Sequence, residues 1–253
     1  MSPARQPLAL RPNPALTHVS SAMVMAAGLG KRMRPLTATR PKPLIKVAGK
    51  MLIDHSFDRL RAANIHRAVV NVHYLADAVE AHLRLRQRDF DLIISDERDH
   101  LLETGGGLVK AGSLIDDDQF LVVNSDCLWI DGPVDAICLL DQRWDPERMD
   151  ALLLMVPLAR AWCHSGSGDF HMDADGLLRR RQSGRVAPFV YSGVQIVSRR
   201  LLRDPPEGAF STNLLWNRAI EEGRCFGLVH EGLWFDVGTP QAITRTEKIL
   251  RHG

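Results

Sequence analysis

The chain has 253 residues, of which 45% are hydrophobic and 25% charged, and its formal net charge is +2. This composition is typical of a globular protein with a full core, which we place in a single domain over residues 21–253; it excludes extensive disorder, and the small net charge argues against a protein that coats nucleic acid. The four cysteines are widely spaced and no apolar run approaches the roughly 18 residues of a membrane span, so we expect a cytoplasmic protein with neither nucleic-acid nor membrane partners.

The N-terminal part combines a leader, a strand and a basic loop. Residues 1–20 contain four prolines and no apolar periodicity, which predicts a flexible leader. The apolar run 22–27 predicts a buried strand, and Gly28 and Gly30 after it can present backbone N–H groups to an anion. Residues 1–53 carry nine Lys or Arg and no Asp or Glu, so the ligand of the loop is predicted to be a polyanion.

Strands and helices alternate along the next hundred residues. The predicted strands are 68–74, 91–96 and 119–126, and the predicted helices are 54–64 with Asp54 as cap, 76–86, and one introduced by the glycine triplet 105–107 and ending near 114. This alternation predicts an α/β fold of the Rossmann-like kind, a mostly parallel sheet flanked by helices. Ligands of such sheets bind at the carboxyl ends of strands, so the basic loop and the triplet Asn124-Ser125-Asp126 are predicted to meet in one crevice.

The second half of the chain is less regular and predicts a small mixed β portion. Asp175-Gly176, between short alternating segments within 168–181, predicts a hairpin. The other predicted elements are strands at 151–158, 188–197 and 225–232, a helix at 211–223 with Ser211 or Thr212 as its cap, and a final helix from about 241 after WFDVGTP at 234–240.

Several motifs, taken together, resemble the sugar-1-phosphate nucleotidylyltransferase family. They are the glycine-arginine signature at 28–35, PKPL at 41–44, an Asp that ends a central strand, and FDVGTP at 235–240. The resemblance covers approximately residues 22–250 and implies the nucleotide-diphospho-sugar transferase fold, with 21–135 mainly binding nucleotide and 150–240 mainly binding sugar. It also implies that a sugar 1-phosphate oxygen attacks the α-phosphorus of a nucleoside triphosphate and that pyrophosphate leaves, a reaction suited to catalysis by positioning and fixed cations.

Within the family, three segments are most similar to the branch that joins UTP to N-acetylmuramate 1-phosphate in the recycling of peptidoglycan sugars. They are LETGGG at 102–107, GDF at 168–170 and YSGV at 191–194. The resemblance thus implies UTP and that sugar phosphate as partners, and nothing in the sequence implies a protein partner. Two other reactions remain alternatives, because selectivity depends on pocket shape, which motifs do not encode well. One joins GTP to mannose 1-phosphate, and the other transfers a thymidylyl or uridylyl group to glucose 1-phosphate. A non-catalytic nucleotide-sugar sensor is a further alternative, although this chain retains the residues that such a protein would be expected to lose.

The resemblance also implies roles for individual residues. Arg32 and Lys42 match the family's catalytic cations, and Asp126 and Asp236 match the two carboxylates that hold Mg²⁺, the implied cofactor. The implied nucleotide-binding residues are Ala27, Gly28, Leu29, Gly30, Arg32, Lys42, Glu103, Thr104, Gly105 and Gly106, and the implied sugar-binding residues are Asn124, Gly168, Asp169, Tyr191, Ser192 and Gly193.

The sequence departs from the family at one lysine. Many relatives carry a second lysine in the sugar half that meets the sugar phosphate, whereas no lysine lies between Lys110 and Lys248 here. The phosphate is held either by the metal and the N-terminal lysine alone or by an arginine that replaces the missing lysine. The candidate arginines are Arg179, Arg180, Arg181 and Arg185.

Other patterns receive no role. Met33 stands where a dinucleotide-binding fingerprint would have its third glycine, and the phosphate-loop string of kinases is absent, which excludes both classes. The histidines His164, His171 and His230 show no partner spacing.

Overall fold

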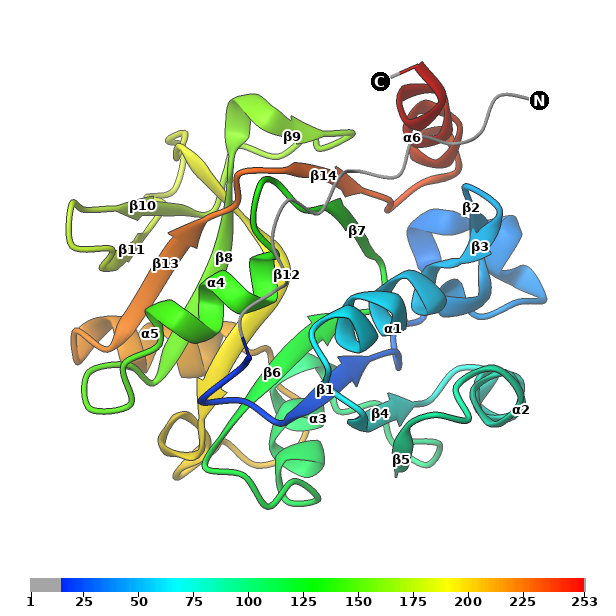
Figure 1. Cartoon of the computed structure of the whole chain (residues 1–253), viewed down its shortest axis with the longest axis horizontal. Helices are drawn as coiled ribbons and strands as arrows, with labels where there is room; N and C mark the ends of the chain where they lie inside the picture. Colours follow the sequence, from blue (N-terminus) through cyan, green and yellow to red (C-terminus); the bar gives the residue numbers. More distant parts are fainter. Residues whose placement is uncertain (1–14, 253) are drawn as a thin grey trace.

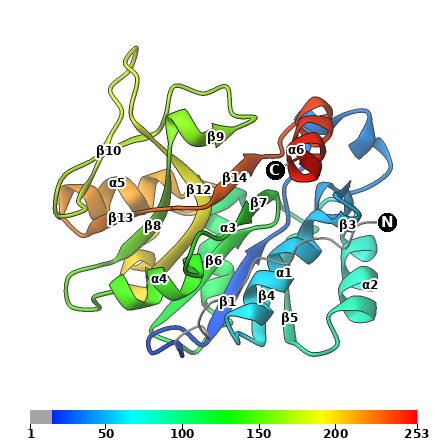
Figure 2. The same cartoon turned by 45° about the horizontal axis from the view of Figure 1, so that its top comes forward.

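The computed structural model describes residues 15–252, so residues 1–14 of the predicted leader lie outside the described part. Nine strands form one sheet, with helices on both of its faces (Figure 1, Figure 2). The strand order is β11-β10-β12-β6-β1-β4-β5, and in addition β8 pairs with β12 and β13 with β8. These strands are β1 (Ser21–Met25), β4 (Arg67–Val72), β5 (Asp91–Asp96), β6 (Gln119–Asn124), β8 (Ala151–Pro157), β10 (Phe170–Met172), β11 (Leu178–Arg180), β12 (Phe189–Ser198) and β13 (Cys225–Val229).

The half of the sheet formed by β6, β1, β4 and β5 is parallel. Successive side chains of a strand face opposite sides, and in β1 Val24 packs into one core cluster while Met23 packs into another. The first cluster includes residues of α1 (Leu52–Ala62), α2 (Ala76–Arg86) and α4 (Ala136–Arg143), and the second includes residues of α3 (Glu103–Gly112) and α5 (Asn213–Glu221). The sheet is therefore buried between two layers of helices, which confirms the predicted Rossmann-like architecture.

The other half of the sheet is mixed, as predicted. Strand β12 is antiparallel to both β6 and β8, and the hairpin β10-β11 lies at the edge, with Asp175-Gly176 in its turn. In the register of β12 and β6, Val194 lies opposite Val123. The residues just before Val194 consequently lie beside the carboxyl end of β6, where the crevice was predicted.

A second, three-stranded sheet returns the end of the chain to the middle of the molecule. Strand β14 (Leu233–Asp236) lies between β7 (Cys127–Ile130), which is antiparallel to it, and β9 (Ala161–Trp162), which is parallel. The final helix α6 (Pro240–His252) follows β14 (Figure 1). A short hairpin of β2 (Lys46–Val47) and β3 (Lys50–Met51) precedes α1, and the short 3-10 helices are η1 (Lys31–Met33), η2 (Leu36–Ala38), η3 (Lys42–Leu44), η4 (Leu158–Arg160) and η5 (Arg199–Leu202).

The predicted helix bounds are confirmed for α2, but two predictions about helix starts are wrong. The N-cap of α1 is Met51, and Asp54 lies inside its first turn. The triplet Gly105–Gly107 does not precede α3 but lies within it, since α3 begins at Glu103. The predicted cap position of α5 is confirmed at Thr212, although its side chain makes no capping hydrogen bond.

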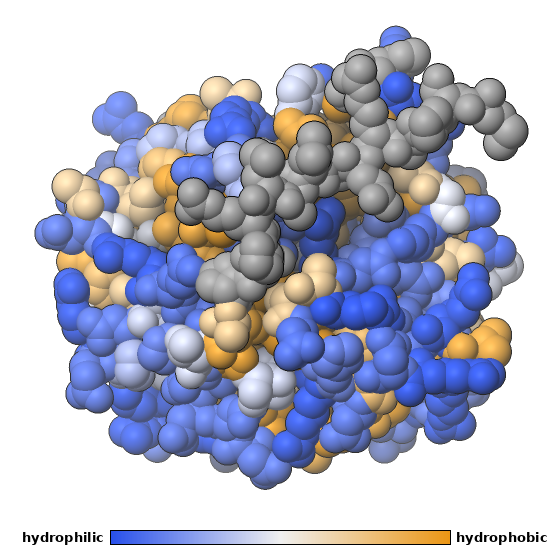
Figure 3. Space-filling model, in the orientation of Figure 1, coloured by the Kyte–Doolittle hydropathy of each residue, from blue (hydrophilic) through white to orange (hydrophobic). Residues whose placement is uncertain are grey.

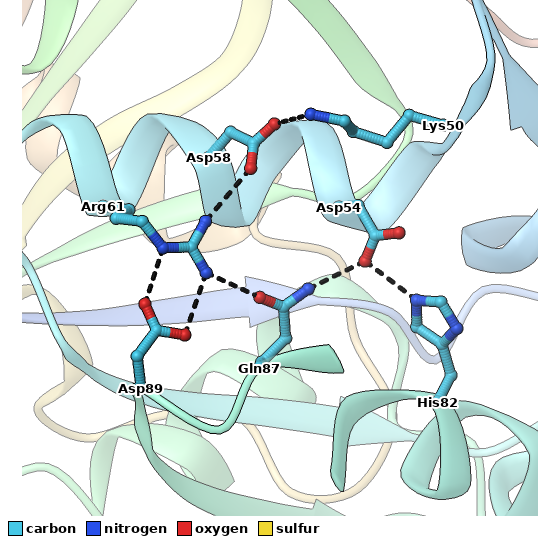
Figure 4. Close-up of polar contacts among 7 residues, drawn as sticks. All are labelled: Lys50, Asp54, Asp58, Arg61, His82, Gln87 and Asp89. Carbon is cyan, nitrogen blue, oxygen red and sulfur yellow. Dashed lines mark hydrogen bonds and ion pairs between the residues drawn. The ribbon is translucent and has the colours of Figure 1, made fainter. Parts of the chain in front are cut away.

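Asp54 ties α1 to α2 instead of capping α1 (Figure 4). Its carboxylate Oδ1 is hydrogen-bonded to Nε2 of His82 and accepts a hydrogen bond from Nε2 of Gln87, each at 2.8 Å. Arg61 of α1 donates to Oε1 of Gln87 at 3.0 Å and pairs with Asp89 at 2.6 Å. Exposed ion pairs add little free energy, so this network acts mainly by fixing α1 against the end of α2.

The residues before β1 are anchored on α4. The carboxylate of Asp141 accepts hydrogen bonds from the backbone N–H groups of Thr17, His18 and Val19 at 2.7, 2.9 and 3.0 Å. Asp141 is only 1% exposed and Val19 only 4%. The anchored part of the chain therefore begins before residue 21, within the segment predicted to be the leader.

The surface is mixed. Hydrophilic side chains cover much of the face in Figure 3, and apolar ones gather there in separate patches. None of the helices within residues 15–252 has the length and apolar character needed to cross a bilayer.

Candidate active site

The loop after β1 bends at a glycine that no other residue could easily replace. Gly30 has a φ of 60°, and a Cβ there would lie 3.0 Å from both Cβ of Lys42 and Cγ2 of Thr37. The hydroxyl of Thr37 donates to the carbonyl of Gly30 at 2.8 Å. The loop is thus folded onto the segment that carries Lys42, and the helix η1 that follows leaves Arg32 exposed.

A first cavity, of about 390 Å³, opens at the carboxyl ends of β1 and β6. Its walls include several of the predicted nucleotide-binding residues, namely Ala27, Gly28, Lys42, Glu103 and Thr104. Asn124 and Asp126, at the end of β6, line it as well. The cavity falls within the size range of small-molecule sites and lies where a doubly wound sheet binds its ligand.

A neighbouring loop cavity, of about 380 Å³, takes in the rest of the basic loop. Leu29, Gly30 and Arg32 line it, and it shares Lys42 and Asp126 with the first cavity. The two predicted catalytic cations and one predicted metal ligand therefore border one continuous region.

Gly105 and Gly106 do not line either cavity, although they were predicted to contact the base. Their N–H groups both donate to the carbonyl of Phe210, at 2.7 and 3.2 Å. A Cβ at Gly105 would lie 2.4 Å from the ring of Phe210. The structure thus uses these glycines to pack the segment before α5 closely against α3, and only Glu103 and Thr104 of this motif reach the cavity.

A third cavity, of about 180 Å³, is lined by the two predicted metal ligands, Asp126 and Asp236, and by most of the predicted sugar-binding residues. We call these two aspartates the dyad and this cavity the dyad cavity. The predicted sugar-binding residues in its wall are Asn124, Asp169, Tyr191, Ser192 and Gly193. Gly193 has a φ of 92°, and a Cβ there would lie 3.1 Å from Cβ of Asn124, so β12 approaches the end of β6 closely. Gly168 lines a different cavity beside the hairpin β10-β11.

The pairing of β7 with β14 brings the two aspartates together. Asp236 lies opposite Cys127, the residue after Asp126, and both aspartates line the dyad cavity. Nζ of Lys42 lies 2.6 Å from Oδ2 of Asp126, and Nδ1 of His164 lies 3.0 Å from Oδ2 of Asp236. Within the described residues, no hydrogen bond reaches Oδ1 of either aspartate. Each carboxylate therefore keeps one oxygen for a further ligand.

The surroundings of Asp236 favour its ionised form. Burial alone would raise the pKa of this carboxyl, and the hydrogen bond and the charge of His164 act against that effect. The positive charges of Arg32 and Lys42 act in the same direction, and the pKa of Asp236 is lowered. The carboxylate is consequently ready to bind a cation.

His164 is a residue of the site that the sequence did not single out. It lines the dyad cavity, and its Nε2 is buried without a hydrogen-bond partner in the described chain. A Cβ at Gly166 would lie 2.3 Å from this nitrogen, so the turn after His164 closes over the ring. The contact with Asp236 spans 72 positions of sequence, and no local pattern could have indicated it.

Asn71 is a second residue that was missed. Its side chain accepts a hydrogen bond from the N–H of Ala26 and donates one to Oε1 of Glu97, each at 2.7 Å, and it lines the first cavity. The residue is 2% exposed. The available signal was a single amide within the apolar stretch 68–72 of β4, since a polar group expected to be buried needs a partner.

Comparison with known proteins identifies the family to which this chain belongs. Residues 21–151, more than half of the chain, match the family described as nucleotidyl transferase. The chain therefore belongs to the nucleotidyl transferase family, which confirms the resemblance of its motifs.

Individual relatives are similar to this chain over most of its length. The N-acetylmuramate alpha-1-phosphate uridylyltransferase of Caulobacter vibrioides is 49% identical over 90% of this chain and 96% of its own. The protein of the same name from Neisseria meningitidis serogroup B is 34% identical over 86% of this chain and 93% of its own. A solved structure titled as a putative glucose-1-phosphate thymidylyltransferase from Bacillus anthracis shares the fold, with a TM-score of 0.76 at 16% identity, over 91% of this chain and 95% of its own.

Proposed function

We propose that this protein transfers the uridylyl group of UTP to N-acetylmuramate 1-phosphate, giving UDP-N-acetylmuramate and pyrophosphate, and that it serves peptidoglycan recycling in the cytoplasm. The observation that carries the proposal is that the first cavity, the loop cavity and the dyad cavity all include Asp126. A nucleotide and a sugar phosphate bound on either side of this residue would meet there. The two relatives named N-acetylmuramate alpha-1-phosphate uridylyltransferase support the choice of UTP and N-acetylmuramate 1-phosphate.

The cations have distinct positions in this proposal. Arg32 borders both the loop cavity and the dyad cavity, so it can contact the phosphates that leave as pyrophosphate. Lys42 is 9% exposed and borders the first cavity, where it can bind the phosphates near the reacting centre. Fixed positive charges in a water-poor site stabilise the charge that develops on the leaving group, and holding both substrates in line supplies the remaining catalysis.

We further propose that Asp126 and Asp236 hold Mg²⁺. This cation takes oxygen ligands and is usually bound through one or two carboxylates plus substrate phosphates. The two carboxylates, each with one oxygen free of hydrogen bonds among the described residues, fit that requirement. Residues 15–252 contain no group of three or more metal-binding side chains, which agrees with a site that substrate completes. A bound Mg²⁺ would neutralise phosphate charge.

The substrate choice is tested by measuring pyrophosphate release for each of the four nucleoside triphosphates with four sugar 1-phosphates: N-acetylmuramate, N-acetylglucosamine, mannose and glucose. We expect the highest kcat/KM with UTP and N-acetylmuramate 1-phosphate, and loss of activity with excess chelator. Higher kcat/KM with GTP and mannose 1-phosphate would contradict the substrate assignment. Absence of pyrophosphate with every pair would favour the non-catalytic sensor.

The metal ligands are tested by Asp126→Asn and Asp236→Asn. Each change removes a negative charge with little change of shape, so kcat should fall by about 10²- to 10³-fold or more, as when one electrostatic stabiliser is removed. Asp116→Asn is the matched control, because the Asp116 side chain is 83% exposed and, among the described residues, pairs only with Arg67. Full activity of either dyad variant at saturating Mg²⁺ and substrates would contradict the assignment.

A further inference from the structure

A hairpin cavity, of about 350 Å³, lies beside the dyad cavity and is not used by the proposed reaction. The hairpin β10-β11 and helix α5 form its walls, and Asp169 and Tyr191 line both it and the dyad cavity. The two cavities therefore meet at these side chains. A substrate in the dyad cavity can extend a substituent past them into the hairpin cavity.

Arg180 gives this cavity a positive charge. Within the described residues no carboxylate forms an ion pair with it, although the charge of Asp169 in the same cavity wall acts on its guanidinium. Its guanidinium carbon lies 4.6 Å from the centre of the Phe170 ring and 5.4 Å from that of the Trp216 ring. Nε donates to the amide oxygen of Asn217 at 2.7 Å, and Nη2 donates to the amide oxygen of Asn213 at 2.9 Å. All these partners are neutral, and Arg180 forms no ion pair in the described chain. Burial lowers the pKa of its guanidinium, consistent with a cation partly removed from water.

One donor of Arg180 is left over. The described residues provide no hydrogen-bond acceptor for Nη1, although carboxylates are the usual bidentate partners of arginine. The hydroxyl of Tyr191, whose ring packs on Trp216 at 4.8 Å between centroids, is likewise buried without a partner. Buried polar groups normally have partners, so the unpartnered Tyr191 hydroxyl, beside an Arg180 side chain that lines the same cavity, indicates a missing ligand with acceptor oxygens.

The neighbouring arginines do not provide the same function. Arg181 donates to the carbonyls of Gly168 at 2.8 Å and Arg185 at 2.9 Å, so its guanidinium holds the loop after β11. Arg179 is exposed, and alternation along β11 turns it away from the side that carries Arg180. Among the described residues, Arg180 and Arg181 both line the hairpin cavity, and Nη2 of Arg181 also has no acceptor there. Arg180 differs in that aromatic rings and neutral amides hold its guanidinium, whereas backbone carbonyls of the loop hold that of Arg181.

We propose that the hairpin cavity binds a carboxylate of the sugar substrate through Arg180 and that Arg180 thereby determines sugar specificity. This inference rests on the proposed function. The 1-phosphate of the sugar must lie near Asp126 and Asp236, whereas the hairpin cavity includes neither residue. N-acetylmuramate carries a second anionic group, the carboxylate of its 3-O-lactyl ether, and the other sugars considered above do not. Arg180 binds this group, and Asp169 lies between the two anions, beside the sugar ring.

The test compares two sugars that differ only in the lactyl ether. Wild type, Arg180→Gln and Arg180→Lys are assayed with UTP and either N-acetylmuramate 1-phosphate or N-acetylglucosamine 1-phosphate. Loss of a charge-assisted hydrogen bond should lower kcat/KM for the lactyl sugar by about 10- to 100-fold in Arg180→Gln, mainly through KM, with a smaller loss in Arg180→Lys. The kcat/KM for N-acetylglucosamine 1-phosphate should stay within about twofold. Arg179→Gln, which removes an exposed charge from the same strand, is the matched control.

Calorimetric binding of UDP-N-acetylmuramate and UDP-N-acetylglucosamine gives the same comparison without turnover. Equal losses for both sugars would overturn the proposal, because they would mean that Arg180 binds the shared phosphate or supports the fold. Unchanged selectivity would overturn it as well. A wild-type protein that neither turns over N-acetylmuramate 1-phosphate nor binds its nucleotide would instead contradict the proposed function, so the two failures are distinguishable.

Discussion

His164 fixes the orientation of one carboxylate of the dyad. Its hydrogen bond to Asp236 leaves one oxygen of that side chain free, and outer-shell partners of metal ligands typically contribute about 10- to 100-fold to metal affinity or activity. We expect His164→Leu to raise the Mg²⁺ concentration for half-maximal activity by a factor in that range. Activity titrated against Mg²⁺ at saturating substrates measures the effect.

The conservative variant separates positioning from packing. In His164→Asn the amide nitrogen can take the place of Nδ1, and part of the Mg²⁺ affinity should return. His100→Leu, at an exposed histidine, should behave as wild type. Equal Mg²⁺ dependence in wild type and His164→Leu would show that the contact has no role in metal binding.

The sequence could predict single residues where a local motif carries them. The loop glycines, Arg32, Lys42 and the strand-terminal Asp126 lie in short recognisable segments, and the structure brings them to adjoining cavities. His164 and Arg180 could not be found in this way, because their importance lies in contacts with distant segments. Arg180 stood among four arginines that differ only in which way the chain turns them.

At the scale of elements, α4 holds the segment before β1 through Asp141. Asp141→Ala would remove the acceptor for three backbone N–H groups, leaving the buried one of Val19 and the partly buried ones of Thr17 and His18 unpaired. We expect the free energy of unfolding to fall by about 2–4 kcal/mol, since each unpaired buried donor costs about 1–3 kcal/mol and such costs are not additive. Urea denaturation followed by circular dichroism measures the change.

Two further variants serve as references for the loss of stability in Asp141→Ala. Asp118→Ala, at an exposed side chain, should change stability by less than about 0.5 kcal/mol. Asp135→Ala removes the N-cap of the same helix, where the carboxylate accepts hydrogen bonds from Ile137 and Cys138, and should cost about 1 kcal/mol. An effect of Asp141→Ala no larger than that of Asp118→Ala would mean that the segment before β1 adds nothing to stability.

Periodicity predicted the regular elements and missed those that depend on context. Helix α2 and strand β5 have the predicted bounds because their apolar spacing is clear. Helix α4 is short, and strands β7 and β9 exist only because β14 pairs with both. The glycines predicted to introduce α3 lie inside it although glycine disfavours helix, and at Gly105 the close packing against Phe210 leaves no room for a Cβ.

For the whole molecule, the half-buried His55 and the buried His230 make stability depend on pH. Burial lowers the pKa of His55 and of His230 below the usual value of 6.5, so these rings bind a proton less readily in the folded protein than in the unfolded chain. In the unfolded chain they take up protons as the pH falls through about 6.5, so the unfolded state binds more protons and is favoured. The free energy of unfolding should therefore be lower at pH 5.5 than at pH 7.5.

The double variant His55→Gln/His230→Gln tests whether these histidines lower the free energy of unfolding at acidic pH. It should show a smaller decrease between pH 7.5 and pH 5.5 than wild type when urea denaturation is measured at both values. His100→Gln, at an exposed site, should retain the decrease of wild type. A double variant with an unchanged decrease would assign the pH dependence to other groups.

The overall topology could be predicted only in part. Alternating strands and helices indicated the parallel half correctly, because each connection there is local in sequence. The return of the chain end to β7 is a pairing over about a hundred residues, and the resemblance of the motifs, not their spacing, suggested that Asp126 and Asp236 belong together.

The position of the hairpin β10-β11 at one edge of the sheet has an evolutionary consequence. It pairs with the rest of the sheet through β12 and through an isolated bridge between Leu177 and Phe226, and β12 separates it from the parallel strands that carry the basic loop and Asp126. Mutations that remodel this edge can therefore alter which sugar is accepted while the phosphate chemistry persists. Related proteins could then come to use different sugars through changes in this short stretch of chain. Selection for turnover alone would preserve the rest of the sequence.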